Sequence, residues 1–446
     1  MAKNLTTGSP LNLIVLFTLP LLVGNLFQQA YAVVDTIVVG RMIGVQALAA
    51  VGASGSLQFL LVGFAMGCSA GLAIPVSRFF GAGELHRMRR AVAMGALISA
   101  AVAVVITLVG TVGAPHLLRL LGTPAELLPM STTFLRVFSA GAVATTAFNY
   151  LSSVIRALGD STTPLLFLIL ASVLNVVLVV TFIGGLGMGV GGAALATVLA
   201  QLVSALLCLL LVWRRMPELH LKRSDFALDL PQLRESARLG FTLGFQMSII
   251  AIGAAMLQFG INQLGATAVA AFTTSMRVDQ MAVIPLASVG VAMATFVAQN
   301  AGAGQWRRIL DGVRSALQLS IGMSLLLGLL IFLFGTHLVE LFVGPGQPEV
   351  VGMAHHYLVV NSALYAILSV LFVLRHSIQG LGSTVAPTAA GVLELVARGV
   401  VGLLLVQHIG FLGVILAAPA AWVLALFPLL LAWRAHRRLL MARVGV

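Results

Sequence analysis

Long, uninterrupted apolar segments recur along this chain from end to end, and they restrict its fold more than any other feature. Each is close to the ~20 residues that a helix needs to cross a bilayer. Of the 446 residues, 60% are apolar and only 9% are charged, whereas a soluble protein carries roughly 25% charged residues. So little charge cannot keep so much apolar surface in water. The sequence therefore predicts an all-α integral membrane protein.

The apolar segments predict twelve transmembrane helices joined by short loops. The first begins at Leu11, after a short polar N-terminus without a small-residue cleavage site, so we expect no cleaved signal peptide. The longest polar stretch, 214–238, is a connecting loop rather than a soluble domain. The predicted spans are 11–40, 46–77, 91–114, 130–155, 164–184, 189–213, 236–262, 268–298, 312–335, 352–378, 387–407 and 411–433.

The positive charges lie mainly on alternate sides of these spans. The N-terminus, every second loop and the C-terminus together hold 20 of the 25 Lys and Arg residues. The positive-inside rule then places both termini in the cytoplasm. The net charge of +12 is explained as a topology signal, and we expect no nucleic-acid partner. Arg far outnumbers Lys and Ala is abundant, which is typical of bacteria with high genomic G+C. We therefore predict a multi-pass protein of the bacterial plasma (inner) membrane.

The sequence aligns with itself at a shift of 221 positions. The loop Gly81-Ala82-Gly83 meets Gly302-Ala303-Gly304, and the register holds through the flanking helices. With six helices in each half, both halves enter the membrane from the same face. We predict two six-helix bundles related by a pseudo-two-fold axis along the membrane normal, with domains at residues 1–220 and 221–446. Transporters built this way place their site near the midplane between the halves.

Three acidic residues, Asp35, Asp279 and Glu394, lie well within predicted helices. An ionised carboxylate that faces lipid costs at least about 2.5 kcal/mol, so each must face the protein interior, form a pair or be protonated. Glu394 lies four residues before Arg398, and we predict a structural ion pair between them. As the alternative, Glu394 and Asp279 form a negative surface that contacts cationic substrates.

Asp35 is the strongest of the three candidates, because it belongs to a polar stripe on the first helix. The stripe covers one arc of roughly 120°, centred on Ala32, and should face the bundle. The equivalent stripe on the seventh helix is almost wholly apolar, so we expect the ion chemistry in the N-terminal half. Pro20, inside the same helix, deletes a backbone hydrogen bond and predicts a kink. The stripe consists of Asn25, Gln28, Gln29, Asp35 and Thr36.

Soft methionine and aromatic side chains suit an adaptable substrate cavity. No Walker loop and no catalytic or metal-ligating cluster is present in the sequence. We therefore expect neither an enzyme nor an ATP-driven pump, no cofactor, and a monomer whose partners are small molecules and the lipid bilayer. The candidate cavity residues are Asn25, Gln29, Tyr31, Met66, Met256, Asp279 and Glu394.

Several motifs, in this order on twelve helices, resemble those of the multidrug and toxic compound extrusion (MATE) transporters, prokaryotic type. The resemblance covers essentially the whole chain. It implies two bundles around a V-shaped cavity and the exchange of organic cations or amphipathic drugs for protons or sodium ions. The motifs are Pro20 through Val34-Asp35-Thr36 to Gly40, the two Gly-Ala-Gly loops, Arg156-Ala157-Leu158-Gly159-Asp160, and Ala298-Gln299-Asn300-Ala301-Gly302.

The resemblance also implies roles for single residues. Asn175 and Thr197 match the family's partners of the helix 1 aspartate, Asp35; Gln28 on the polar stripe completes our coupling set. Pro20 matches the proline at which helix 1 bends when the aspartate is neutralised, which displaces the drug by alternating access. The second aspartate of many members is absent, since residues 176–180 are all apolar. This favours protons over a sodium ion at Asp35.

Two other transporter classes compete with this assignment. The major facilitator superfamily has an Asp-Arg pair in its basic loop, which 78–84 lacks. A flippase for a lipid-linked saccharide, from the same superfamily as the MATE transporters, would use cationic residues in its cavity. The intramembrane Arg136, Arg277 and Arg398 are its best support, and we keep the flippase as the alternative.

Overall fold

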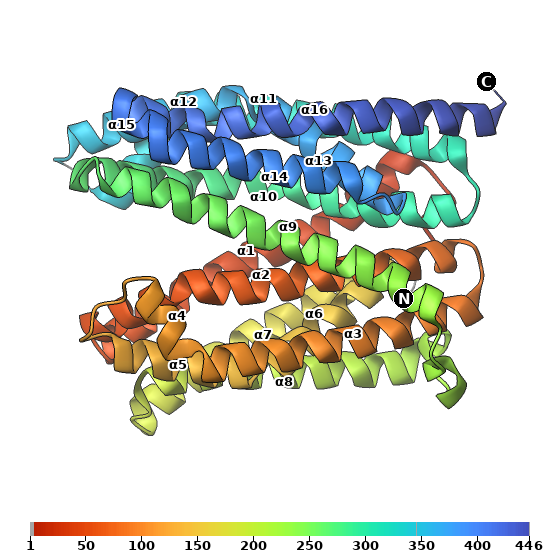
Figure 1. Cartoon of the computed structure of the whole chain (residues 1–446), viewed down its shortest axis with the longest axis horizontal. Helices are drawn as coiled ribbons and strands as arrows, with labels where there is room; N and C mark the ends of the chain where they lie inside the picture. Colours follow the sequence, from red (N-terminus) through yellow and green to blue (C-terminus); the bar gives the residue numbers. More distant parts are fainter. Residues whose placement is uncertain (1–3, 345, 446) are drawn as a thin grey trace. The chain divides into compact units, whose positions relative to one another are not determined.

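The computed structural model describes residues 4–344 and 346–445, and helices make up most of this range (Figure 1). The predicted all-α class is confirmed. The main helices are α1 (Pro10–Met42), α2 (Val45–Gly81), α3 (Leu85–Val112), α4 (Ala114–Leu120), α5 (Leu128–Ala140), α6 (Ala142–Ala157), α7 (Thr162–Val180), α8 (Gly189–Arg215), α9 (Leu230–Asn262), α10 (Ala266–Gly302), α11 (Trp306–Val343), α12 (Pro348–Ala363), α13 (Tyr365–Gly380), α14 (Val385–Val400), α15 (Val406–Ile409) and α16 (Phe411–Val444). Short elements are the π-helical turns η1 (Thr181–Gly185) and η4 (Val401–Leu405) and the 3-10 turns η2 (Pro217–Leu219) and η3 (Arg223–Phe226).

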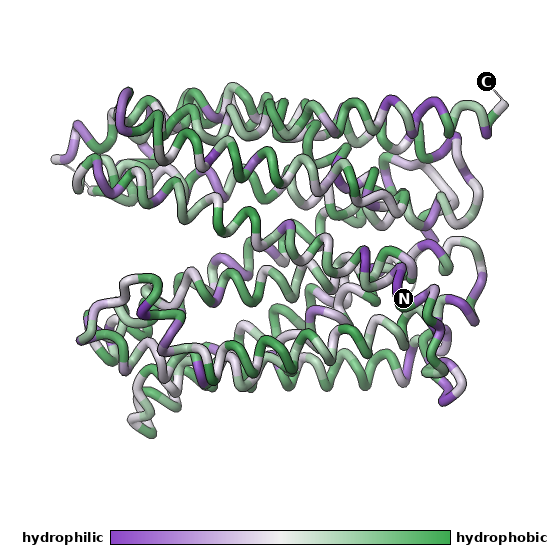
Figure 2. The backbone as a smooth tube through the Cα atoms, viewed as in Figure 1, coloured by the Kyte–Doolittle hydropathy of each residue, from purple (hydrophilic) through white to green (hydrophobic). Residues whose placement is uncertain are grey.

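The helices have the length and polarity of membrane spans. Within the described residues, nine are long and apolar enough to cross a bilayer, and the pair α12 and α13, bent by 51°, makes a tenth. Apolar residues cover the middle of the helices, and hydrophilic residues gather at their ends (Figure 2). The chain is therefore a multi-pass membrane protein.

Three of the predicted spans are interrupted helices. Span 130–155 is α5 followed by α6, span 352–378 is the bent pair, and span 387–407 is α14, η4 and α15. The break between α5 and α6 lies at Gly141, where a Cβ atom would be 2.2 Å from a methyl group of Val198 on α8. Glycine at this break lets α8 approach the α5–α6 junction closely.

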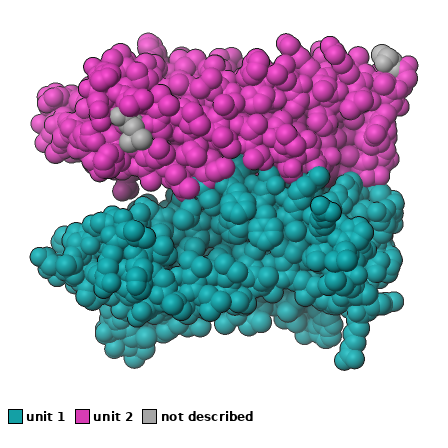
Figure 3. All heavy atoms as spheres, in the orientation of Figure 1, with its two compact units in different colours: residues 1–4, 19–248 teal, residues 5–18, 249–446 magenta. Residues whose placement is uncertain are grey.

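The helices form two compact units (Figure 3). Unit 1 contains Leu19–Ser248, and unit 2 contains Leu5–Thr18 and Ile249–Val446. Two long helices are therefore shared: α1 passes from unit 2 to unit 1 after Thr18, and α9 passes from unit 1 to unit 2 after Ser248. This grouping of segments does not test the domain boundary predicted between residues 220 and 221, which stays a prediction.

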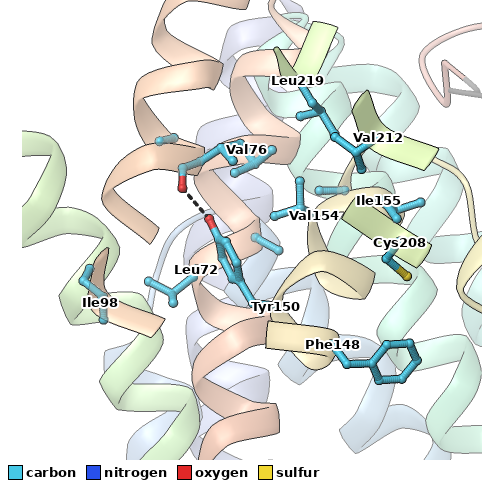
Figure 4. Close-up of a cluster of buried hydrophobic side chains, with 14 of the residues drawn as sticks. Leu72, Val76, Ile98, Phe148, Tyr150, Val154, Ile155, Cys208, Val212 and Leu219 are labelled. Atoms are coloured by element: carbon cyan, nitrogen blue, oxygen red, sulfur yellow. Dashed lines mark hydrogen bonds between the residues drawn. The ribbon is translucent and has the colours of Figure 1, made fainter. Parts of the chain in front are cut away.

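The core of unit 1 lies between α2, α3, α6 and α8 (Figure 4). The hydroxyl group of Tyr150 in this core has a hydrogen-bond partner, because it donates to the carbonyl oxygen of Val92 at 2.7 Å. Cys208 is a buried, free member of this core, as expected of a small hydrophobe. The apolar side chains labelled in the figure are Leu72, Val76, Ile98, Phe148, Val154, Ile155, Val212 and Leu219.

The first part of α9 packs directly on the backbone of α2 within unit 1. A Cβ atom on Gly67 would lie 2.4 Å from the carbonyl oxygen of Leu243, and one on Gly71 would lie 2.4 Å from that of Leu239. Small residues four positions apart allow such backbone contact between membrane helices. In unit 2, α10 packs against α11, α12 and α13, and α14 packs against α16.

Candidate functional site

A cavity of about 370 Å³ lies within unit 1 and is lined by α1, α2, α5, α6, α7 and α8. The side of α1 that we predicted to face the bundle contributes Gln28, Gln29 and Ala32 to its wall, and Tyr31, which lies outside the predicted arc, also lines it. The remaining lining residues are Gly55, Gln58, Phe59, Val62, Phe138, Thr145, Leu168, Ala171, Ser172, Asn175, Thr197, Ala200 and Gln201.

Residues from three helices meet at the wall near α1. The side-chain nitrogen of Asn175 on α7 donates to the hydroxyl oxygen of Thr197 on α8 at 3.0 Å, and Thr197 in turn donates to the carbonyl oxygen of Ala193 at 3.2 Å. Tyr31 on α1 also lines the cavity. Asp35 follows Tyr31 by one helical turn. The structure therefore joins Asn175 to Thr197 and places Gln28 on the same cavity wall, whereas Asp35 is not among the residues that line the cavity.

Several oxygen atoms at this site are buried and have no hydrogen-bond partner. They include Oδ1 of Asp35, Oδ1 of Asn175 and Oε1 of Gln201. A buried acceptor left without a donor costs about 1–3 kcal/mol, and such a group in a native structure calls for a missing donor, water or ion. A proton on Asp35 meets this need with one hydroxyl donor. A hard cation needs several oxygen ligands at once.

The expected coupling set provides one carboxylate and three neutral side chains. Asp35 is the single carboxylate of the set, and Thr197 Oγ1 is already engaged with Asn175 and Ala193. Within the described part of the chain, no group of three or more His, Cys, Asp or Glu side chains could hold a metal ion.

Twelve of the seventeen cavity-lining residues were not among our predicted site residues, and the polar Gln201, Gln58 and Thr145 belong to these twelve. Gln201 lies four residues after Thr197 and hence on the same face of α8, so helical periodicity could have identified it. Gln58 occupies the repeat position of Asp279, 221 residues earlier, which is also visible in the sequence. Thr145 gives no such signal, because its position depends on the break at Gly141.

Five other predicted cavity residues do not line this cavity. Asn25 is half-buried on α1 and Met66 is 42% exposed on α2, both in unit 1. Met256, Asp279 and Glu394 belong to unit 2. Their assignment to a substrate cavity stays a prediction.

The ion pair predicted between Glu394 and Arg398 is wrong. Glu394 on α14 instead pairs with Arg375 on α13, and both side chains are buried. The prediction used spacing along one helix, whereas the packing of α13 on α14 supplied a closer cation. Asp279 accepts a hydrogen bond of 2.6 Å from the hydroxyl of Tyr365. Unit 2 therefore holds its own buried polar groups, in a different arrangement from the site in unit 1.

Comparisons with known proteins agree with this architecture. The family model described as MatE matches twice, at residues 20–181 and 242–404. The two matches begin 222 residues apart, which confirms the internal repeat.

The chain is 29% identical to the probable multidrug resistance protein YpnP of Bacillus subtilis, over 86% of this chain and 85% of that protein. It is 27% identical to the probable multidrug resistance protein YoeA of the same organism, over 92% and 90%. The solved structure titled "Crystal structure of MATE in the bent conformation" matches with a TM-score of 0.91 and 22% identity, over 99% of this chain and 98% of that one. The chain therefore belongs to the MatE family, and it is a membrane transporter rather than an enzyme.

Proposed function

We propose that the chain exports small amphipathic or cationic molecules across the bacterial plasma membrane in exchange for protons, by alternating access. One observation carries the proposal: Oδ1 of Asp35 is buried without a partner, on the same helix as the cavity-lining residues Gln28, Gln29 and Tyr31. The similarity to two probable multidrug resistance proteins supports drug-like molecules as the substrate class. Under this proposal the chain acts as a monomer, and both of its termini face the cytoplasm.

The coupling step is the change of charge on Asp35. In the ionised state this carboxylate has an oxygen with no donor, at a cost of about 1–3 kcal/mol. Uptake of a proton removes the charge and turns one oxygen into a donor. The carboxyl group can then bond to an acceptor of the site such as Oδ1 of Asn175, which itself lacks a partner. The site thereby favours a different position of α1 in its two protonation states.

The movement would occur at Pro20, which interrupts the backbone hydrogen bonds of α1 near its passage between the units. Bending there shifts Gln28, Gln29 and Tyr31, which form the α1 wall of the cavity, and so changes the space for a drug. Exchange of one proton for one monovalent cation moves no net charge, and yields about 1.4 kcal/mol per pH unit. A second proton would add about 2.3 kcal/mol per 100 mV.

The test is drug efflux from proteoliposomes, with proton and sodium gradients imposed separately. We expect the proton gradient alone to drive efflux of a fluorescent organic cation. Asp35→Asn, which cannot change charge, should lose gradient-driven efflux and keep drug binding. Asp311→Asn is the matched control, because Asp311 is an exposed carboxylate at the start of α11. Full gradient-driven efflux by Asp35→Asn would refute the proposal. Efflux driven by the sodium gradient alone would identify sodium, and not the proton, as the coupling ion.

A further inference from the structure

The segment that precedes α1 is tied to unit 2 by side chains from the end of α10 and the start of α11. The backbone nitrogen of Leu5 donates to Oε1 of Gln299 at 2.9 Å. The side-chain nitrogen of Asn300 donates to the carbonyl oxygen of Leu5 at 3.2 Å. We call this set, Leu5 to Gly8 with Gln299, Asn300 and Arg308, the N-terminal clasp; all of it belongs to unit 2.

Arg308 is the centre of the clasp. Its Nη2 donates to the carbonyl oxygen of Leu5 at 3.2 Å and its Nη1 to that of Gly8 at 2.6 Å. Its Nε donates to Oδ1 of Asn300 at 3.0 Å, which orients the amide toward Leu5. Hydrogen bonds from a charged donor are roughly twice as strong as neutral ones, and the planar guanidinium fixes their geometry.

The contacts order a stretch of chain that would otherwise be free. Segments near a chain terminus are poorly ordered unless they are tied down, yet Leu5 is only 2% exposed. Gly8 adopts a φ of 90°, a conformation that glycine takes readily, and so turns the chain into α1, which starts at Pro10. The start of α1 is therefore held by specific bonds rather than by apolar packing alone.

The other repeat holds the start of α9 at the equivalent place, with different chemistry. Gln299 corresponds to Arg78, 221 residues earlier, and Gly8 corresponds to Asp229. In unit 1, Arg78 pairs with Glu235 at 2.9 Å and Arg90 pairs with Asp229 at 3.2 Å. Each repeat thus ties the chain at the beginning of the helix that passes to the other unit. The two anchors use different residues, because Arg87, the repeat equivalent of Arg308, pairs with Glu84 instead.

We propose that Arg308, with Asn300 and Gln299, is a positioning residue of the transport cycle. The clasp stays closed and fixes the first turns of α1 to unit 2. Because α1 leaves unit 2 after Thr18, two residues before Pro20, a bend at that proline is then transmitted to the part of α1 that carries the cavity face and Asp35. Without the clasp, a bend at Pro20 would move the residues that precede Pro20 instead of the part of α1 that carries Asp35. This inference rests on the proposed function.

The first test compares Arg308→Ala with Arg307→Ala, since Arg307 is the exposed neighbour on the same turn. We expect Arg308→Ala to lower the kcat of drug efflux about tenfold or more, at nearly unchanged KM and drug affinity; tenfold corresponds to about 1.4 kcal/mol in the rate-limiting step. Arg308→Lys keeps the charge but not the fork of donors, and should be intermediate. The proposal would be overturned if Arg308→Ala had the kcat of the wild type. It would also be overturned if the loss of kcat disappeared at a temperature where both proteins are fully folded.

The second test asks whether the clasp stays closed, and its distance measurement needs no functional assumption. Cysteines at the exposed positions Thr7 and Arg307, in a background without Cys68 and Cys208, receive a bifunctional maleimide or two spin labels. We expect the cross-linked protein to transport at the rate of the uncross-linked one, and a single short inter-label distance that broadens only in the Arg308→Ala background. Loss of transport on cross-linking, or a second long distance without that substitution, would show that the clasp opens. If no gradient drives efflux by the wild type, the proposed function fails, while the distance measurement still decides on the clasp.

Discussion

The buried ion pair between Arg375 and Glu394 offers the sharpest test of the structure of unit 2. The two side chains are 4% and 8% exposed, so removal of one partner leaves a charge in an environment that cannot solvate it. Such a change costs about 3–5 kcal/mol, whereas replacement of both partners by apolar residues is often neutral or stabilising. We therefore expect Arg375→Met and Glu394→Leu to be strongly destabilising alone and nearly harmless together.

The expected shift in Tm follows from the size of unit 2. The unit contains about 210 residues, and an unfolding entropy near 2.1 cal/mol/K per residue makes 1 kcal/mol equivalent to about 2 °C. Each single variant should then melt about 7–11 °C below the wild type in detergent, followed by tryptophan fluorescence. The double variant should melt within about 2 °C of the wild type.

The matched control is the exposed pair Arg87–Glu84, whose side chains are 61% and 45% exposed. Surface pairs of this kind contribute about 0–1 kcal/mol, so Glu84→Leu should shift the Tm by no more than about 2 °C. The reasoning is refuted if Glu394→Leu melts like the wild type, or if the double variant is as unstable as the single ones. Either result would mean that the pair is not a buried, charge-compensated unit.

Further predictions concern the helix contacts and the two polar sites. Gly71→Ala should destabilise the protein by about 1–3 kcal/mol through overpacking, because the new methyl group would lie 2.4 Å from a backbone oxygen of α9. Gly52 has no atom within 4 Å of the position of a Cβ atom, so Gly52→Ala should be neutral or stabilise by up to about 1 kcal/mol. Thermal melts measure both changes. Thr197→Val should cost only about 0.6–1.7 kcal/mol of stability but impair gradient-driven efflux, and an unchanged efflux rate would remove this hydroxyl from the coupling site. Tyr365→Phe should cost about 1–3 kcal/mol, since the carboxylate of Asp279 loses its 2.6 Å donor, and Asp279→Asn in the same background should recover most of that loss in the same melting assay.

Much of the fold could be predicted from the sequence, because lipid imposes simple rules on a helix. Length and polarity alone located the helices, including the three spans that are interrupted. The interruptions themselves could not be predicted, since the break at Gly141 depends on how closely Val198 of α8 approaches. The sharing of α1 and α9 between the units has the same origin, as it follows from packing between distant segments rather than from any local pattern.

The site shows the same division between local and distant information. The polar stripe on α1 could be predicted from a single helix, and Gln28, Gln29 and Ala32 of that side line the cavity. The partner of Glu394 could not be predicted in this way. Spacing along α14 indicated Arg398, but the packing of α13 on α14 brings Arg375 closer to Glu394. Neighbours along one helix can be predicted from its period, but competition between helices for the same charge is decided only by the tertiary structure.

Each unit contains a helix segment from the other half of the sequence, and this has a consequence for how such a chain can arise and how it can be expressed. Leu5–Thr18 is a member of unit 2, and the beginning of α9, up to Ser248, is a member of unit 1. An ancestral half-length chain with this architecture would have needed a second copy to complete its bundle, as in a domain-swapped dimer. In this chain each unit contains a segment from the other half of the sequence. A fragment cut at residue 220 would lack the turns of α9 that cover Gly67 and Gly71, so neither half should fold unless the other is synthesised in the same cell.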